Sequence, residues 1–249
     1  MGRRITISFV SIAGFIALWI ALAFKIADPQ ILPGPDALVG PFLAELASGE
    51  LIYHLSQTLL RVVWAFALAM ILGTSIGFVM GASDRVNDWL DPWLVVFLNL
   101  PALVLIVLCY LWIGLNETAA IAAVTLNKVP NVAVVIREGT RARSPDTAAL
   151  AQVYRMGRVA RIMHVDLPQL APFVAAAARS GIAVIWKIVL VVELLGRSNG
   201  VGFQIHLYFQ LFDVGMVLVY AFSFIAVMLV VEWCLLQPWE RSSRRWRQA

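Results

Sequence analysis

The stretch 119–136 is apolar except for a small group of ionisable and amide side chains. Lys128 lies near its middle, between Asn127 and Asn131, and Pro130 precedes the second amide. A cation in apolar surroundings needs either a compensating charge or a watery cavity. Pro130 removes a backbone donor and favours irregular backbone, which is tolerated where it lines a cavity. We therefore expect Asn127, Lys128 and Asn131 to line a polar pathway. The alternatives for Lys128 are a structural ion pair or a side chain that extends toward the membrane interface.

A second apolar stretch, 172–194, contains Lys187 and Glu193. The two residues are six positions apart, which is about 240° around a helix. They cannot easily pair within one helix, so each needs a partner elsewhere. Both are candidate pathway residues, and a structural role is the alternative that we favour for Glu193.

The sequence lacks the residue patterns that nucleotide binding, metal binding or enzymatic catalysis would require. The chain has no G-x-x-x-x-G-K-[ST] sequence for nucleotide phosphates and no His-Glu-x-x-His. Its three histidines lie in separate segments, which argues against a metal site. The glycines of 196–202 predict a tight turn. We therefore expect no enzymatic activity, no metal site and no cofactor on this chain.

The composition indicates a membrane protein. Hydrophobic residues make up 61% of the 249 residues and charged residues only 14%. Long apolar windows predict six transmembrane helices in a single all-α domain, 1–249. These windows are 5–24, 59–80, 93–113, 119–136, 172–194 and 214–236. The first window could be a signal peptide, but its length and its Phe24-Lys25 end favour a retained span.

Basic residues predict the orientation. Arginines gather before the first window, between the fourth and fifth, and after the sixth. The positive-inside rule then places both termini and the segment 137–166 in the cytoplasm. The acidic segment 86–92 does not fit this pattern by itself. The net charge of +4 reflects topology and does not indicate nucleic acid.

One apolar window carries a stripe of small residues. Ala65, Ala69, Gly73, Gly77 and Gly81 recur every four positions. Such stripes let helix backbones approach closely in lipid. We interpret this stripe as a packing surface within the subunit, with a subunit interface as the less favoured alternative.

The polar segment 145–168 lies between the fourth and fifth windows. Pro145 suits a first helical turn, Asp146 favours the positive helix end, and Gly157 offers a break. Pro168 is expected to end the segment. A short polar turn would connect two spans equally well, so a folded helix here predicts a docking partner.

Several stretches of the sequence resemble the permeases of ATP-binding-cassette importers. The cytoplasmic loop of that family has the pattern E-A-A-x3-G-x9-I-x-L-P, whose end matches Val165-x-Leu167-Pro168. Counting back places Ala149-Leu150-Ala151 on E-A-A and Arg155 on the glycine. The stretches LWIGLNE (111–117), ELLGRSNGVGF (193–203) and LPGP (32–35) are similar to permeases of the nitrate, sulfonate, bicarbonate and taurine group.

This resemblance implies a six-span permease bundle in the bacterial inner membrane, with a coupling helix between spans four and five. It implies a homodimer or paired permease, two cytoplasmic ATPase subunits that hold ATP and Mg, and a periplasmic or lipid-anchored binding protein. The substrate is then a small solute, and the two lysines favour an anion. The residues that would contact the ATPase are Ala149, Leu150, Ala151, Gln152, Val153, Tyr154, Arg155, Met156 and Gly157. A secondary transporter or channel is the alternative, and the absence of a visible inverted repeat counts against it.

Overall fold

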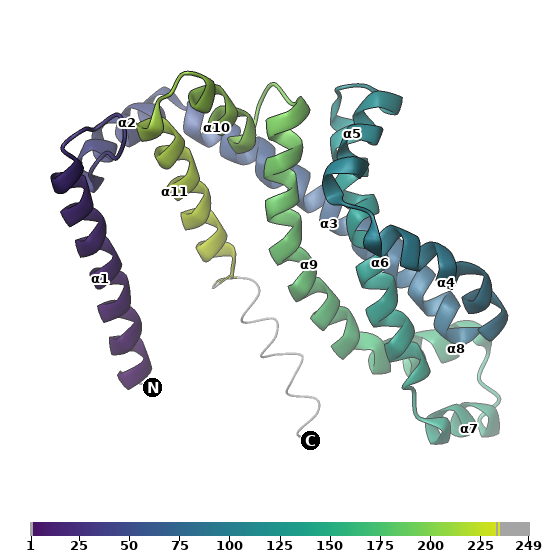
Figure 1. The fold of residues 1–249 in the computed structure, drawn as a ribbon. Coiled ribbons are helices and arrows are strands. Elements are labelled where there is room, and N and C mark those ends of the chain that lie inside the picture. The colour runs from purple at the N-terminus through teal and green to yellow at the C-terminus, as the bar shows by residue number, and fades with distance from the viewer. Residues whose placement is uncertain (1, 233, 235–249) are drawn as a thin grey trace.

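The computed structural model describes residues 2–232 and 234, and these residues form helices and no strand (Figure 1). The side chains of 2–6, 8, 9, 145, 148, 150, 152 and 158 lie outside this description, as does the basic tail of 241–247. The helices are α1 (Gly2–Ile26), α2 (Pro35–Ser48), α3 (Glu50–Ala82), α4 (Asp84–Asn99), α5 (Ala102–Ile113), α6 (Glu117–Arg141), α7 (Pro145–Val153), α8 (Arg158–Arg161), the π-helix η1 (Ile162–Asp166), α9 (Leu167–Gly196), α10 (Val201–Gln210) and α11 (Val214–Val231).

Among the described residues, four helical stretches are long and apolar enough to cross a membrane. They are α3, α6, the run Val159–Gly196 and α11, and the bent pair α4–α5 makes a fifth if it is one span. The apolar part of α1, Val10–Ile26, is shorter. The last predicted window, 214–236, extends beyond the described part of the chain. The count of six spans therefore stays a prediction.

The predicted continuous span 93–113 is a broken one. Helices α4 and α5 meet at an angle of 99°. Pro101 stands at the break, where it precedes α5, and Leu100 has an extended ψ of 125°. A proline disfavours the helical conformation for the residue before it, which accounts for the bend.

The irregular backbone expected at Pro130 is absent, because α6 continues through this residue from Glu117 to Arg141. Pro168 likewise does not end the segment before α9. It lies in the first turn of α9, directly after η1, where the Leu167 N–H bonds to the Ile162 carbonyl five residues back. A π-turn accommodates a position that has no N–H to donate.

The core is built around α3, which runs diagonally behind α6 and α9 in Figure 1 and packs most extensively on α6. The stripe of small residues forms this contact. A Cβ added to Gly73 would lie 2.6 Å from the Val132 Cβ, and one added to Gly81 would lie 2.5 Å from the Thr140 Cβ. The stripe is therefore a packing surface within the subunit, as predicted.

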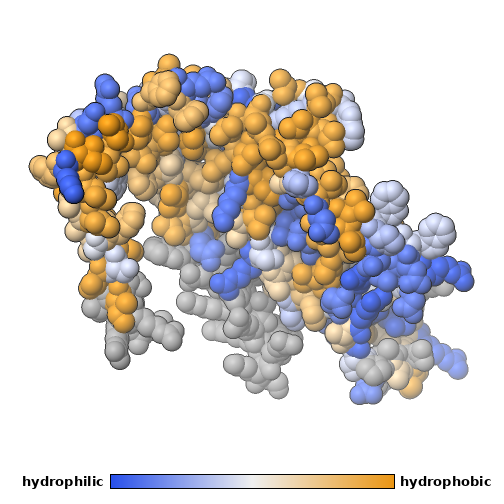
Figure 2. All heavy atoms as spheres, viewed as in Figure 1, coloured by the Kyte–Doolittle hydropathy of each residue, from blue (hydrophilic) through white to orange (hydrophobic). Residues whose placement is uncertain are grey.

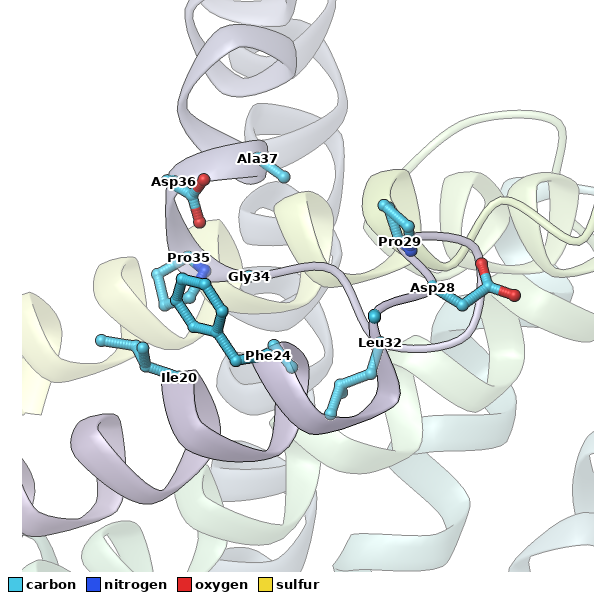
Figure 3. A pocket seen from close by; sticks show the side chains of 11 residues that line it. Ile20, Phe24, Asp28, Pro29, Leu32, Gly34, Pro35, Asp36 and Ala37 are labelled. Atoms are coloured by element: carbon cyan, nitrogen blue, oxygen red, sulfur yellow. The ribbon is translucent and has the colours of Figure 1, made fainter.

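Helix α1 stands at one edge of the molecule (Figure 1). The Trp19 indole N–H donates to the Pro33 carbonyl at 3.1 Å, and its ring lies 5.4 Å from that of Phe222. A pocket of about 350 Å³ lies between the end of α1 and the start of α2. Figure 3 shows the side chains that line it, among them Phe24. Asp28 and Asp36 also line this pocket, so its charge suits no anion.

Hydrophilic residues gather at the end of the molecule that carries α7 and α8 (Figure 2). There the acidic residues of α4 meet the arginines of α6: Arg137 contacts Asp91, and Arg141 lies 3.9 Å from Asp84. Of the acidic segment 86–92, which did not fit the charge pattern, Asp91 thus pairs with a basic residue of α6.

Candidate functional site

The strongest electrostatic feature is a buried charge cluster on Arg61, which the sequence interpretation missed. The Arg61 side chain is 2% exposed, and its Nε and Nη2 donate to Glu117 at 2.6 and 3.0 Å. Its Nη1 donates to Glu193 at 2.6 Å and to the Asn199 carbonyl at 3.0 Å. The signal was present in the sequence, because Arg61 is a charged residue within the apolar window 59–80.

The same cluster holds the start of α10. The Gly202 N–H donates to Glu193 Oε2 at 2.8 Å, and the Val201 N–H donates to Thr58 Oγ1 at 2.8 Å. The Gly200 N–H donates to His54 Nδ1 at 3.0 Å. Free N–H groups at a helix start need acceptors, and here side chains of α3 and α9 supply them. These contacts fix the turn between α9 and α10 onto α3.

The glycines of this turn permit close approach, which confirms the predicted tight turn. Gly200 has a φ of 107°, a conformation that L side chains rarely adopt. A Cβ on Gly202 would collide with the Leu190 carbonyl oxygen and lie 2.8 Å from the Glu193 Cβ. Any side chain here would displace the carboxylate that Arg61 requires.

Arg61 of α3 is therefore the partner of Glu193, which was expected to pair with a residue outside its own helix. Glu193 is fully buried, and the cluster carries two arginines and two glutamates, because Arg197 also pairs with Glu117 at 2.9 Å. A charge-balanced, hydrogen-bonded cluster is tolerable in a low-dielectric interior. This geometry favours the structural alternative for Glu193 over a pathway role.

Lys128 has different surroundings. It is 4% exposed, yet no hydrogen bond or ion pair to it occurs among the described residues. A Cβ on Gly181 of α9 would lie 3.2 Å from the Lys128 Cε. The Thr125 hydroxyl, one turn away on α6, is also buried without a partner. The structure thus offers no support for the structural ion pair that was one alternative for Lys128.

The other predicted pathway residues do not gather around Lys128. Lys187 is exposed, and it lies six positions beyond Gly181, about 240° around α9, on a different face. Asn127 is half-buried and Asn131 is exposed. Within this chain, Lys128 is the one buried cation of the predicted set.

The predicted coupling segment is a helix, a turn and a second helix. Helix α7 ends at Val153, four residues before the predicted limit at Gly157. Arg155, which aligns with the glycine of the family pattern, has a φ of 48° in the turn. Glycine adopts this conformation freely, whereas another residue incurs a strain on the order of 1–3 kcal/mol. Arg155 thus adopts a conformation that a glycine at this position would adopt without strain.

The side chains of this segment face in different directions. Val153 and Tyr154 are 77% and 73% exposed, and Ala149, Arg155 and Gly157 are exposed too. Ala151 is 3% exposed and packs inside the chain, and Met156 is half-buried. The side chains of Leu150 and Gln152 lie outside the described residues. The segment was expected to face a partner along its whole length. Of its described residues, only the exposed ones remain candidates for that contact, and Ala151 does not.

Several long apolar helices with a polar helical segment between two of them are the arrangement of a multi-pass membrane protein. Residues 65–236 match the family of binding-protein-dependent transport system inner membrane components. The chain belongs to this family, and it is a multi-pass inner-membrane permease of an ATP-binding-cassette importer. Partners of two general kinds follow from the family, an ATPase and a substrate-binding protein.

Curated relatives cover most of the chain. It is 30% identical to the putative aliphatic sulfonates transport permease protein SsuC of Bacillus subtilis, over 78% of this chain and 70% of the relative. It is 26% identical to the taurine transport system permease protein TauC of Escherichia coli (82% and 77%). It is 27% identical to the bicarbonate transport system permease protein CmpB of Synechococcus elongatus (81% and 76%).

A solved structure shares the fold. A chain of a crystal structure described as an amino acid ABC transporter with histidines aligns with a TM-score of 0.65 and 22% identity. The alignment covers 81% of this chain and 98% of that one. The fold class predicted from the sequence is confirmed.

Proposed function

We propose that the chain forms half of the translocation pathway for a small solute with an anionic group, such as an aliphatic sulfonate, taurine or bicarbonate, that an external binding protein delivers. The observation that supports an anionic substrate is the environment of Lys128. It is a buried cation without a compensating charge among the described residues. A cation at this depth lowers the barrier for an anion that crosses a low-dielectric region. The names of the relatives agree with this class of substrate.

The second half of the pathway would come from another permease subunit. An apolar groove of about 500 Å³ runs between the outer faces of α3 and α6, lined by Trp64, Leu68, Leu72 and Ile121 among others. Its wall includes the buried, unpartnered Thr125 hydroxyl. A homodimer or a paired permease that covers this groove is part of the proposal.

The exposed end of α7 would dock on a separate ATPase, which holds ATP and Mg, while this chain binds no cofactor. Both termini and the α7–α8 region would then lie in the cytoplasm. Consistent with this, the start of α1 and helices α7 and α8 lie on one side of the molecule, and α2 and α10 on the other (Figure 1).

The test of coupling is the variant Val153→Asp. Val153 is 77% exposed, so a charge there leaves the fold intact but places a carboxylate in an apolar contact. We expect normal membrane insertion, with at least about a tenfold loss of ATPase co-purification and of ATP-dependent uptake. Val153→Thr, which is similar in shape and uncharged, is the matched control.

A tagged wild-type chain that retains no ATPase but still transports would support the secondary transporter and contradict the importer. Wild-type association and uptake in Val153→Asp would remove α7 from the docking surface. Ala151→Trp is unsuitable for this test, because Ala151 is buried and its enlargement would disturb the fold itself.

A further inference from the structure

A polar pocket of about 250 Å³ lies behind the coupling segment. Its walls come from the end of α6, the start of α7, helices α8 and η1, and the start of α9. Three arginines line it, together with a single carboxylate and several neutral polar groups. The charged lining residues are Arg141, Arg143, Arg161 and Asp166. Figure 2 shows hydrophilic residues concentrated over this end of the molecule.

Arg143 is already occupied. Its Nη1 donates to Asp166 Oδ1 at 2.5 Å, and its Nε donates to the Thr140 carbonyl at 2.7 Å. Asp166 is 5% exposed, so this pair lies in the pocket floor. One arginine and the one carboxylate of the lining therefore neutralise each other.

The other two guanidiniums have only distant partners. Arg141 Nη2 is 3.9 Å from Asp84, whose side chain is 98% exposed, and Arg161 Nε is 3.9 Å from Asp166 Oδ2. Such exposed or long ion pairs contribute little. The pocket lining consequently carries an excess of two positive charges. Among the described residues, no acceptor lies at hydrogen-bond distance from the side chains of Arg141 and Arg161.

This arrangement suits a tetrahedral oxyanion. Guanidinium groups present planar pairs of N–H donors that match the oxygens of phosphate and sulfate. Ser144 places a further hydroxyl in the pocket wall. The volume allows an oxyanion and several waters, since one water occupies about 30 Å³.

We propose that this pocket is an oxyanion-binding site, separate from the translocation pathway, with Arg141 and Arg161 as its ligands. The anion is either a free phosphate or sulfate or the phosphate of an acidic phospholipid headgroup. An anion held between these two residues links α6 to α8, and so links a long apolar helix to the segment that carries α7. The site depends on neither the substrate nor the ATPase.

The experiment measures thermal unfolding of the full-length purified chain in neutral detergent. Sodium sulfate and sodium phosphate are titrated against sodium chloride at equal ionic strength. A ligand that binds only the folded state raises the melting temperature with its concentration. We expect both oxyanions to raise it by a few degrees beyond the effect of chloride. The fitted Kd should weaken at least about tenfold in Arg141→Gln/Arg161→Gln.

Arg85→Gln is the matched control, because Arg85 is an exposed arginine of α4 outside the pocket. It removes the same charge and should keep the wild-type Kd. The single variant Arg161→Gln is measured in parallel and should weaken binding in the same direction, which keeps the test valid if the double variant is unstable.

A second arm distinguishes the source of the anion. The chain is placed in phosphatidylcholine nanodiscs with and without phosphatidylglycerol. Stabilisation by phosphatidylglycerol that the double variant loses assigns the site to a headgroup, and stabilisation by sulfate or phosphate that the double variant loses assigns it to a free ion. Sulfate and phosphate also stabilise folded proteins without binding, so equal stabilisation of the wild type and the double variant would overturn the proposal. Equal stabilisation by chloride and the oxyanions together with no effect of the acidic lipid would overturn the proposal, and so would an equal loss in Arg85→Gln.

Discussion

Arg61 and Lys128 are both buried cations on long helices, yet their surroundings are opposite. Arg61 donates to two glutamates and to Asn199, and it anchors the start of α10. Lys128 lies beside the backbone of Gly181 with no charge partner among the described residues. A buried cation costs several kcal/mol unless it is paired. The contacts of the fold therefore account for the burial of Arg61, whereas no described contact accounts for the burial of Lys128.

This difference separates two kinds of buried charge in membrane proteins. A buried charged residue whose donors or acceptors are paired holds helices together, and its removal strands its partners. A buried cation with unused donors costs stability, and the described contacts of the chain do not offset that cost. On this criterion Glu193 belongs to the first kind and Lys128 to the second.

The largest expected effect is that of Arg61→Met. The change leaves Glu193 buried without its countercharge, which should cost about 3–5 kcal/mol of unfolding free energy. Thermal unfolding in detergent measures this loss. The double variant Arg61→Met/Glu193→Met should recover part of it, because no buried carboxylate is then stranded. Wild-type stability of Arg61→Met would show that the ion pairs of Arg61 do not stabilise the fold.

Gly202→Ala tests the close approach that the Arg61 cluster requires. The added methyl would meet the Leu190 carbonyl and the Glu193 Cβ, and we expect a loss of about 1–3 kcal/mol in the same assay. Gly40→Ala is the matched control, since an added Cβ at Gly40 has no neighbour within 4 Å. Equal effects of the two variants would show that the α9–α10 turn tolerates a displaced carboxylate.

The smallest loss of stability is expected for Lys128→Met, because the change removes an unpaired buried cation and strands no described partner. The free energy of unfolding should equal or exceed that of the wild type. ATP-dependent uptake of an anionic substrate should nevertheless fall at least tenfold, on the order of 1.4 kcal/mol or more in the barrier. Lys187→Met, which removes an exposed lysine, serves as the comparison. A loss of several kcal/mol in Lys128→Met would reveal a structural partner and move this residue into the class of Arg61.

Short-range patterns in the sequence predicted most of the helices and one of their packing surfaces. Apolar windows predicted the long helices, because lipid-exposed backbone must satisfy its own hydrogen bonds. Four-residue spacing predicted the stripe of Gly73 and Gly77, because helix geometry alone puts those residues on one face. The polar segment before α9 was predicted as a helix for the same kind of reason, from its cap and turn residues.

Where partners come from distant parts of the chain, only the tertiary structure decided the outcome. The sequence marked Arg61 as a charge within an apolar window, but its pairing with Glu193 joins residues 132 positions apart. Spacing could state that Glu193 and Lys187 do not pair, but it could not name the partner of either. The left-handed backbone of Arg155 was likewise not predicted, whereas the bend at Leu100 has a local cause in Pro101 that the sequence already contained. Electrostatic energies follow distance in space, and residue order fixes that distance only within a few helical turns.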